Sequence, residues 1–232
     1  MASLDPSLVR GLPPFKGLAP NEIEEMLAKA RYLSYPKGTD VFGQDEEAQD
    51  FFVLVHGRLR AARLTPAGQQ VVVRYIGPGD VFGVAKAIGR TTYPATATAV
   101  VDSTALAWAS QLWEGLMGKF PPLALTTLQT LGSRLQDAQT RVVEMSTEEV
   151  ERRVAHALLR LANQAGRKTE HGVEIDFPIS RQDVAEMTGT TLHTVSRILS
   201  AWEDRGLVEG GRQRIVIKDA HKLLLLAERP TD

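Results

Sequence analysis

The sequence of 232 residues contains no cysteine. This absence excludes disulfide bonds, thiolate zinc sites, cysteine-ligated iron–sulfur clusters and a cysteine nucleophile. No apolar run approaches the ~20 residues that a membrane-spanning helix needs. The N-terminal segment MASLDPSLVRGLPP also lacks the basic patch followed by an apolar core that a secretory signal requires. These absences together predict a cytoplasmic protein.

The charges are nearly balanced, so the chain lacks the basic excess that favours phosphate binding. The formal net charge is −1, and residues 148–232 contain 13 Lys and Arg against 14 Asp and Glu. Any DNA-binding role must therefore depend on where individual charges are placed. The length suits two modest domains, and the 43% apolar and 24% charged contents are those of an ordinary globular protein.

Short β-rich segments separated by turn signals fill residues 32–109, after about 30 residues that are expected to be helical and loop-like. The segments are YPKGTDVF, DFFVLVHG, RLRAARLTPAG, QQVVVRYIGPGD and TATAVVDSTALAWA. Runs of this length, with glycines at the turns between them, predict an antiparallel jelly roll or sandwich. Before them, NEIEEMLAKA has the pattern of one amphipathic helix.

A long helix is expected from Pro121 to Met145. Its apolar residues recur at alternating steps of three and four, which is the heptad pattern of a coiled coil. The residues of this seam are Leu128, Leu131, Leu135, Ala138, Val142 and Met145. The pattern favours a homodimer that packs through the seam, and the alternative is a helix that packs on its own domain.

A second helix is expected to follow the long one. Ser146-Thr-Glu-Glu149 has the spacing of a capping box, so one helix is expected to end near Met145 and another to occupy residues 149–164. After it, AGRKTEHG is expected to be a polar loop and VEIDFPI a short strand.

A helix-turn-helix motif is predicted in SRQDVAEMTGTTLHTVSRILSAWEDRGLVEG. Ala185 lets the two helices approach, Gly189 permits the tight turn, and Val195 packs the second helix onto the first. Ser180 is expected to cap the first helix, with Asp183 three residues later. In the following GLVEGGRQRIVIKD, two β runs flank a Gly-Gly turn and predict a basic winged hairpin.

The second helix of the motif has an apolar and a polar stripe. The apolar residues, expected to pack on the domain, are Leu192, Val195, Ile198, Leu199 and Trp202. The polar stripe has small hydroxyls, one imidazole and one guanidinium, which favours a face in the DNA major groove over a solvated face. Arg197 is expected to bond a guanine. The residues predicted to contact DNA, including those of the hairpin, are Ser180, Thr190, Thr191, His193, Thr194, Ser196, Arg197, Ser200, Arg212 and Arg214.

The order of these parts resembles the bacterial CRP/FNR family of transcription regulators over nearly the whole chain. The segments that support the resemblance are PKGTDVF, FFVLVHGRLR, GQQVVVRYIGPGDVFG and SRQDVAEMTGTTLHTVSRIL. It implies an α+β chain with an effector-sensing β-roll in residues 1–120, a dimerisation helix in residues 121–146 and a winged helix-turn-helix domain in residues 147–232. It also implies a parallel homodimer on a palindromic operator in double-stranded DNA, with RNA polymerase as a further partner if the protein is an activator.

Three departures from the family pattern concern the effector. Cyclic-nucleotide-binding members follow the GDxFG turn with a glutamate for the ribose and later place an Arg-Ser/Thr/Ala pair on the phosphate. Val84 and Pro94-Ala95 stand at these places here, and Ala138-Gln139 replaces the adenine-contacting Thr-Ser pair. The resemblance therefore implies an effector other than cyclic AMP, and the missing cysteines exclude an oxygen-sensing iron–sulfur cluster.

The segment TGTTLHTVSRILSAWE is most similar to the nitric-oxide-responsive, denitrification-related branch of the family. Many other members have a glutamate where this sequence has His193. Because the similarity lies in the DNA-reading segment, it concerns the DNA target rather than the effector.

Histidines and other side chains are further candidates for ligand sites. The five histidines are His56, His156, His171, His193 and His221. No two have metal-ligand spacing, so ordinary surface histidines are the alternative, and haem stays open as a cofactor. Trp108 and Trp113 are expected to pack in the core rather than line a ligand site. Lys86 and Arg90 either attract an anionic effector or are simply solvated.

An enzyme is the competing class of protein, because a jelly roll is also the fold of metal-dependent cupins. That chemistry needs clustered histidine and carboxylate ligands, and the sequence has no such cluster, no nucleophile–base set and no phosphate loop. A third class is a protein-interaction module built on the heptad helix, which the winged helix-turn-helix disfavours. The sequence therefore predicts a regulator without enzymatic activity.

Overall fold

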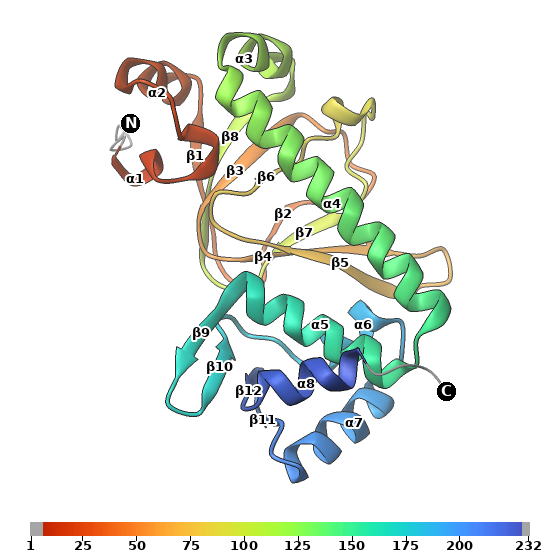
Figure 1. The fold of residues 1–232 in the computed structure, drawn as a ribbon. Helices are drawn as coiled ribbons and strands as arrows, with labels where there is room; N and C mark the ends of the chain where they lie inside the picture. The colour runs from red at the N-terminus through yellow and green to blue at the C-terminus, as the bar shows by residue number, and fades with distance from the viewer. Residues whose placement is uncertain (1–6, 229–232) are drawn as a thin grey trace. The chain divides into compact units, whose positions relative to one another are not determined.

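The computed structural model describes residues 7–228, and the chain forms two compact units (Figure 1). The first comprises Met1–Gly68 and Val73–Gln136, and the second comprises Asp137–Asp232 with Gln69–Val72. The first six residues of the expected N-terminal region and the last four of the expected DNA-binding domain lie outside the described residues.

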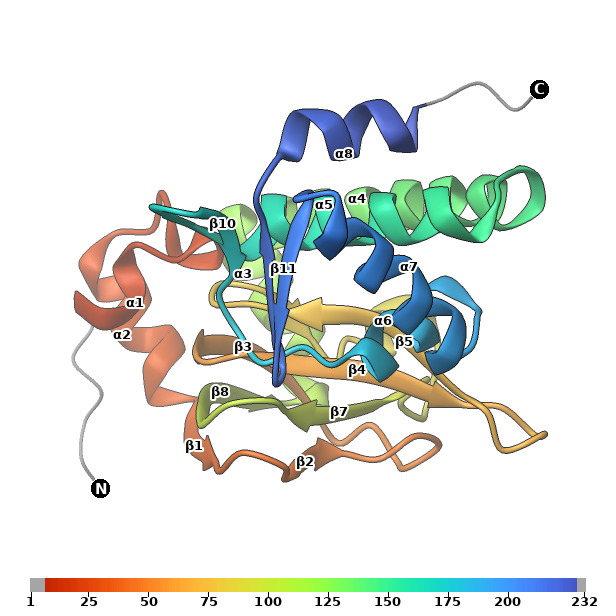
Figure 2. The same ribbon diagram turned by 90° about the horizontal axis from the view of Figure 1, so that it is seen from below.

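Antiparallel sheets form most of the first unit (Figure 2). The strands are β1 (Arg31–Tyr35), β2 (Asp40–Phe42), β3 (Asp50–His56), β4 (Leu59–Leu64), β5 (Gln70–Ile76, whose first three residues belong to the second unit), β6 (Val81–Phe82), β7 (Thr96–Ala99) and β8 (Ser103–Ala109). One four-stranded sheet has the order β1-β8-β3-β6 and the other has the order β2-β7-β4-β5. This arrangement confirms the predicted jelly-roll-like fold.

Both faces of β3 are buried, because successive side chains of a strand point to opposite sides. On one side, Phe51 stacks on Trp108 of β8 with ring centroids 5.6 Å apart, and Trp113 packs edge-on against Phe51. The indole Nε1 of Trp108 donates a hydrogen bond to the Met26 carbonyl at 2.9 Å. On the other side, Phe52 belongs to a second apolar cluster. The prediction that both tryptophans pack in the core is confirmed.

Helices lie before, between and after these strands in the chain (Figure 1). They are α1 (Ser7–Arg10), α2 (Pro20–Ala28), α3 (Trp113–Lys119) and α4 (Pro121–Thr147), with short 3₁₀ helices η1 (Pro13–Phe15), η2 (Lys86–Ile88) and η3 (Ser110–Leu112). α2 corresponds to the predicted NEIEEMLAKA helix and buries Ile23 and Met26. The prediction that Ser146 begins a capping box is wrong. Its Oγ donates to the Val142 carbonyl at 2.8 Å, so α4 continues two residues past Met145.

Helices and a small sheet form the second unit. Its elements are α5 (Val150–Ala165), β9 (Gly166–Thr169), β10 (Gly172–Ile175), α6 (Arg181–Thr188), α7 (Leu192–Asp204), β11 (Val208–Gly211), β12 (Arg214–Ile217) and α8 (Ala220–Ala227). The sheet order is β11-β12-β10-β9, and α5 packs against α6 and α8. Trp202 of α7 is fully buried, and its Nε1 donates to Glu151 Oε1 at 2.8 Å.

Two predictions about turns in this unit are wrong. AGRKTEHG is not simply a loop, because Gly166–Thr169 forms β9 and pairs with β10. This strand is polar and mostly exposed, so its sequence has no alternation of apolar residues. In the wing, Gly210 and Gly211 lie in β11, and the turn consists of Arg212 and Gln213, whose φ is +56°.

Candidate DNA interface and ligand cavity

The helix-turn-helix is held together by the residues whose spacing predicted it. The backbone N–H of Asp183 donates to Ser180 Oγ at 3.1 Å, and the backbone N–H of Ser180 donates to Asp183 Oδ2 at 2.8 Å. Gly189 ends α6 with φ +62°, in the left-handed region that favours glycine. Ala185 and Val195 are buried. The Ser180 hydroxyl, predicted to contact DNA, therefore already serves as the cap of α6.

Replacing Ser180 with alanine is expected to lower the free energy of unfolding by about 1 kcal/mol, because the capped N–H loses its acceptor. Urea denaturation followed by circular dichroism measures this loss. Ser180→Asn keeps a capping oxygen and is the matched control, expected to stay within a few tenths of a kcal/mol of the unsubstituted protein. Equal losses for the two variants would contradict the capping role.

α7 exposes the polar stripe predicted to contact DNA. Its buried side consists of Val195, Ile198, Leu199 and Trp202. His193, Arg197 and Ser200 are exposed on the other side, and Ser196 is half-buried. The prediction that Leu192 belongs to the buried stripe is wrong, since its side chain is 47% exposed. The first residue of α7 lies beyond the part of the helix that packs on the domain.

Threonines surround the N-terminus of α7. Thr191 caps the helix, because its Oγ1 accepts from the backbone N–H of Thr194 at 3.2 Å. The Thr191 and Thr194 hydroxyl oxygens are 3.0 Å apart. The backbone N–H of Thr190 donates to the Ala185 carbonyl at 3.1 Å. Helix N-termini with exposed hydroxyls suit phosphate contacts, which agrees with the predicted role of these threonines.

Arg181 lies beside the predicted reading face, and the sequence analysis missed it. Its guanidinium donates to Glu203 Oε1 at 2.9 Å, and to Ser200 Oγ and the Ser196 carbonyl at 3.4 Å. Arg181 therefore connects the start of α6 to the side of α7. Its only signal was its position next to the cap, which does not specify a partner 22 residues away.

The two arginines of the wing differ in their surroundings. Arg212 is exposed at the turn and makes no hydrogen bond or ion pair within residues 7–228. Arg214 donates to Glu209 Oε1 at 2.9 Å and to Glu174 Oε1 at 3.1 Å. These bonds, first that to Glu209, raise the pKa of Arg214. Arg214 thus joins β12 to β10 and β11, whereas Arg212 makes no such contact among the described residues.

α4 has one face against the first unit and another in solvent. Leu128, Leu135 and Val142, seven residues apart in succession, are 68%, 62% and 66% exposed. Ala138 is exposed as well. Leu131, in contrast, is half-buried against an apolar cluster of the first unit. Packing on its own domain thus applies to the face with Leu131, and the dimer seam stays a prediction for the exposed face.

A cavity of about 230 Å³ lies within the first unit. Val84, Pro94 and Ala95, the residues at the departures from the cyclic-nucleotide-binding pattern, all line it. Positions that are separated in sequence therefore meet at one site, and none of the three provides a charge. Two cations, Arg74 and Arg134, line the cavity from other elements.

Neither arginine of the cavity was among the site residues predicted from the sequence. Arg74 shares a side of β5 with the buried Val72 and Ile76 at a period of two, although the burial of Tyr75 interrupts the alternation. Arg134 follows Leu131 by three residues and shares its side of α4. Both signals were present, but they depend on knowing which face is internal.

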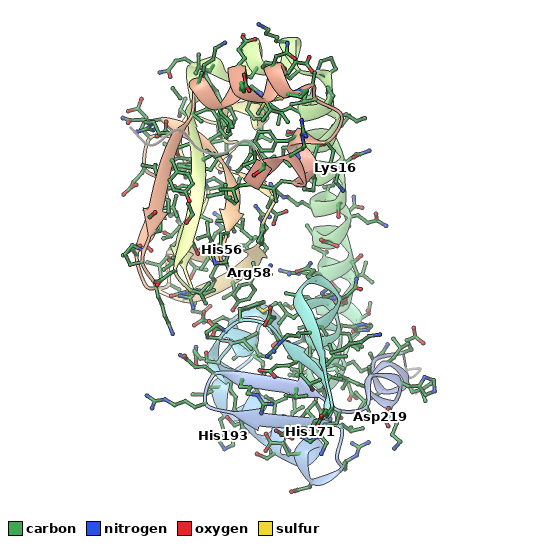
Figure 3. All side chains as sticks on the ribbon, turned by 90° about the vertical axis from the view of Figure 1, so that its left-hand side faces the viewer. Lys16, His56, Arg58, His171, His193 and Asp219 are labelled. Atoms are coloured by element: carbon green, nitrogen blue, oxygen red, sulfur yellow. The ribbon has the colours of Figure 1, made fainter. Side chains whose placement is uncertain are left out.

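No histidine lines the cavity, so it has no imidazole to hold a haem. His171 and His193 belong to separate elements, the β9–β10 turn and α7 (Figure 3). Among the described residues, no group of three or more His, Asp and Glu could bind a metal ion. Lys86 and Arg90 are exposed and do not line the cavity.

Comparisons with known proteins agree with both units. Residues 32–120 match the cyclic nucleotide-binding domain, and residues 152–226 match the Crp-like helix-turn-helix domain. The chain is 31% identical over 212 residues to the cyclic AMP receptor protein of Thermus thermophilus. The matched region covers 91% of this chain and 95% of that protein. The chain belongs to the CRP/FNR family of transcription regulators.

Other regulators of the CRP/FNR kind are also similar. The chain is 28% identical over 191 residues to the nitrogen fixation regulation protein FixK of Azorhizobium caulinodans, covering 82% of this chain and 76% of that protein. The structure of FixK2 from Bradyrhizobium japonicum matches with a TM-score of 0.74 and 25% identity, covering 87% of this chain and 99% of that chain. These relatives are regulators rather than enzymes. No helix in residues 7–228 is long and apolar enough to cross a membrane.

Proposed function

We propose that this CRP/FNR regulator binds a palindromic DNA site as a homodimer, with one α7 helix in the major groove of each half-site. The observation that supports this most directly is Arg197. It is exposed and makes no hydrogen bond or ion pair within the described part of the chain. His193 and Ser200, four residues before it and three after it, share its face of α7. A guanidinium without a protein partner on a recognition helix is suited to a guanine edge.

The proposed homodimer follows from the exposed face of α4. Leu128, Leu135 and Val142 place one large apolar side chain per heptad in solvent. A partner helix with the same pattern would cover them and remove their apolar surface from water. A two-fold dimer would then present its two α7 helices to a DNA site of matching symmetry.

Selection of bound duplexes from a random pool tests the proposed function. The unsubstituted protein should enrich an inverted repeat whose half-sites are centred about one helical turn, roughly 34–36 Å, or a multiple of it apart. Enrichment of an unrepeated motif, or of no motif, would contradict the proposal.

For the DNA target, we propose a half-site similar to those of the nitric-oxide-responsive, denitrification-related branch. The support for this is His193, which is exposed on the reading face where many members have glutamate. A neutral imidazole can donate or accept a hydrogen bond, whereas a carboxylate only accepts. His193 is therefore expected to influence which bases flank the guanine.

We also propose that the effector is not cyclic AMP. The name of the Thermus thermophilus relative refers to that nucleotide, but Val84, Pro94 and Ala95 offer it neither a carboxylate nor a guanidinium.

Calorimetric titration with millimolar cyclic AMP is therefore expected to give no heat of binding. Val84 cannot hold the ribose as the family's glutamate does, and Pro94 and Ala95 cannot hold the phosphate as the family's arginine pair does; Arg74 and Arg134 line the cavity from other elements. The Thermus thermophilus protein titrated in parallel is the positive control. Saturable binding at micromolar concentration would contradict the prediction.

A further inference from the structure

The cavity of the first unit contains two guanidinium groups with few partners. The closest carboxylate to Arg74 is Asp80, whose Oδ2 lies 3.7 Å from Arg74 Nη1, and the Arg74 side chain is only 23% exposed. Asp80 Oδ2 also accepts from the backbone N–H of Gly77 at 2.8 Å, so it is shared. Arg134 donates from Nη2 to the Val81 carbonyl. Its Nε is buried and has no hydrogen-bond partner in the described structure.

The charges at this site are unequal. Two cations face one carboxylate, and burial disfavours their charged forms. Burial, followed by repulsion from Arg134, lowers the pKa of Arg74 to about 9, while Asp80 acts in the opposite direction. Burial also lowers the pKa of Arg134. Guanidinium groups stay protonated in proteins, so an anion between the two would offset the cost of burying both cations.

The remaining wall of the cavity is mainly apolar. Large side chains that line it include Phe82, Val84, Ile88, Tyr93 and Leu131. At about 230 Å³ the space exceeds the ~150 Å³ cavity that is known to hold benzene. It therefore has room for an apolar group of about one ring and one anionic group.

We propose that this cavity binds a small carboxylate with an apolar body of about one aromatic ring or a short branched chain. The carboxylate lies between Arg74 and Arg134, and the apolar body packs against Phe82 and Val84. This inference rests on the proposed function insofar as the carboxylate is the effector. Arg134 lies on α4, the helix that also exposes Leu128, so the ligand would bear on the proposed dimerisation helix.

Isothermal titration of the full chain without DNA tests the ligand class. The probes are phenylacetate, benzoate and isovalerate, with phenylacetamide and acetate as controls that lack the charge and the apolar body. At least one of the three carboxylates should bind saturably, and phenylacetamide and acetate should each bind about tenfold or more weakly than it. No binding of the three below about 10 mM, or equal binding of phenylacetate and phenylacetamide, would overturn the proposal.

Substitutions of the two arginines test the site itself. Arg74→Met and Arg134→Met should each weaken the best carboxylate about tenfold or more, whereas Arg90→Met, at an exposed cation outside the cavity, should not. Without ligand, Arg74→Met should raise the unfolding temperature by a few degrees, because it removes one of two mutually repelling cations and leaves Asp80 with Arg134 and the Gly77 N–H. A purely structural arginine would instead lower that temperature when replaced. Unchanged carboxylate affinity in both variants would overturn the site.

Failure here is distinguishable from failure of the proposed function. Carboxylate binding is measured without DNA, and DNA selection is performed without carboxylate. A protein that selects an inverted repeat but binds no carboxylate refutes the ligand class alone. A protein that binds carboxylate but selects no DNA site refutes the proposed function and leaves the ligand class intact. Operator affinity unaffected by saturating carboxylate refutes its role as effector.

Discussion

Arg197→Ala is expected to abolish nearly all sequence-specific DNA binding while leaving the fold intact. Each bidentate arginine–guanine contact contributes roughly 1–3 kcal/mol of discrimination. A homodimer makes the contact twice, so the loss is roughly 2–6 kcal/mol, or about 30-fold to about 10⁴-fold in affinity. Arg197 has no partner in the described structure, so its removal should leave no protein group unpaired. Binding to the selected operator, measured by fluorescence anisotropy at fixed salt, gives the loss directly.

Two further variants separate base reading from phosphate attraction. Arg197→Lys retains the charge but not the planar fork, so non-specific binding should persist while preference for the guanine falls. His193→Glu should shift the preferred bases within the half-site without abolishing binding, because glutamate only accepts hydrogen bonds whereas neutral histidine can also donate one. If Arg197→Ala keeps the original consensus at near-original affinity, the polar stripe of α7 is not the reading face.

Replacing Leu128 and Leu135 together with aspartate is expected to convert the protein to a monomer. Both side chains are more than 60% exposed in the single chain, so neither substitution should disturb its core. In a dimer, four carboxylates would enter an apolar interface at a cost of several kcal/mol, more than a hundredfold in the dimer dissociation constant. Size-exclusion chromatography with light scattering measures the mass, and specific operator affinity should fall with it.

A matched double variant controls for the added charge. Ser133→Asp with Thr140→Asp adds the same two carboxylates per chain at exposed positions of α4 outside the seam. This control should remain dimeric. A dimeric Leu128→Asp/Leu135→Asp protein, or equal dissociation of both variants, would contradict the seam. Leu131 is not suitable for this test, because it packs on the first unit and its loss would also destabilise that core.

Some side-chain contacts could be predicted from the spacing of residues in the sequence, and others could not. Ser180 and Asp183 are three residues apart, and their reciprocal hydrogen bonds follow from that spacing. Arg212 and Arg214 are equally close, yet only Arg214 is bound by Glu174, 40 residues earlier in the chain. Nothing in the sequence between Glu174 and Arg214 indicates that β10 and β12 become neighbours.

The sequence by itself determined the fold class, the helix-turn-helix and the exposed polar stripe of α7. These depend on period, on capping and on one glycine with positive φ, which are properties of neighbouring residues. Only the tertiary structure decided which side of α4 is open, since a heptad pattern serves packing on the first unit and dimerisation equally well. It alone also brought Arg74 of β5 and Arg134 of α4 to one cavity. These two cations, distant in sequence, share a site because α4 packs over the sheet. The pattern of neighbouring residues does not predict that packing.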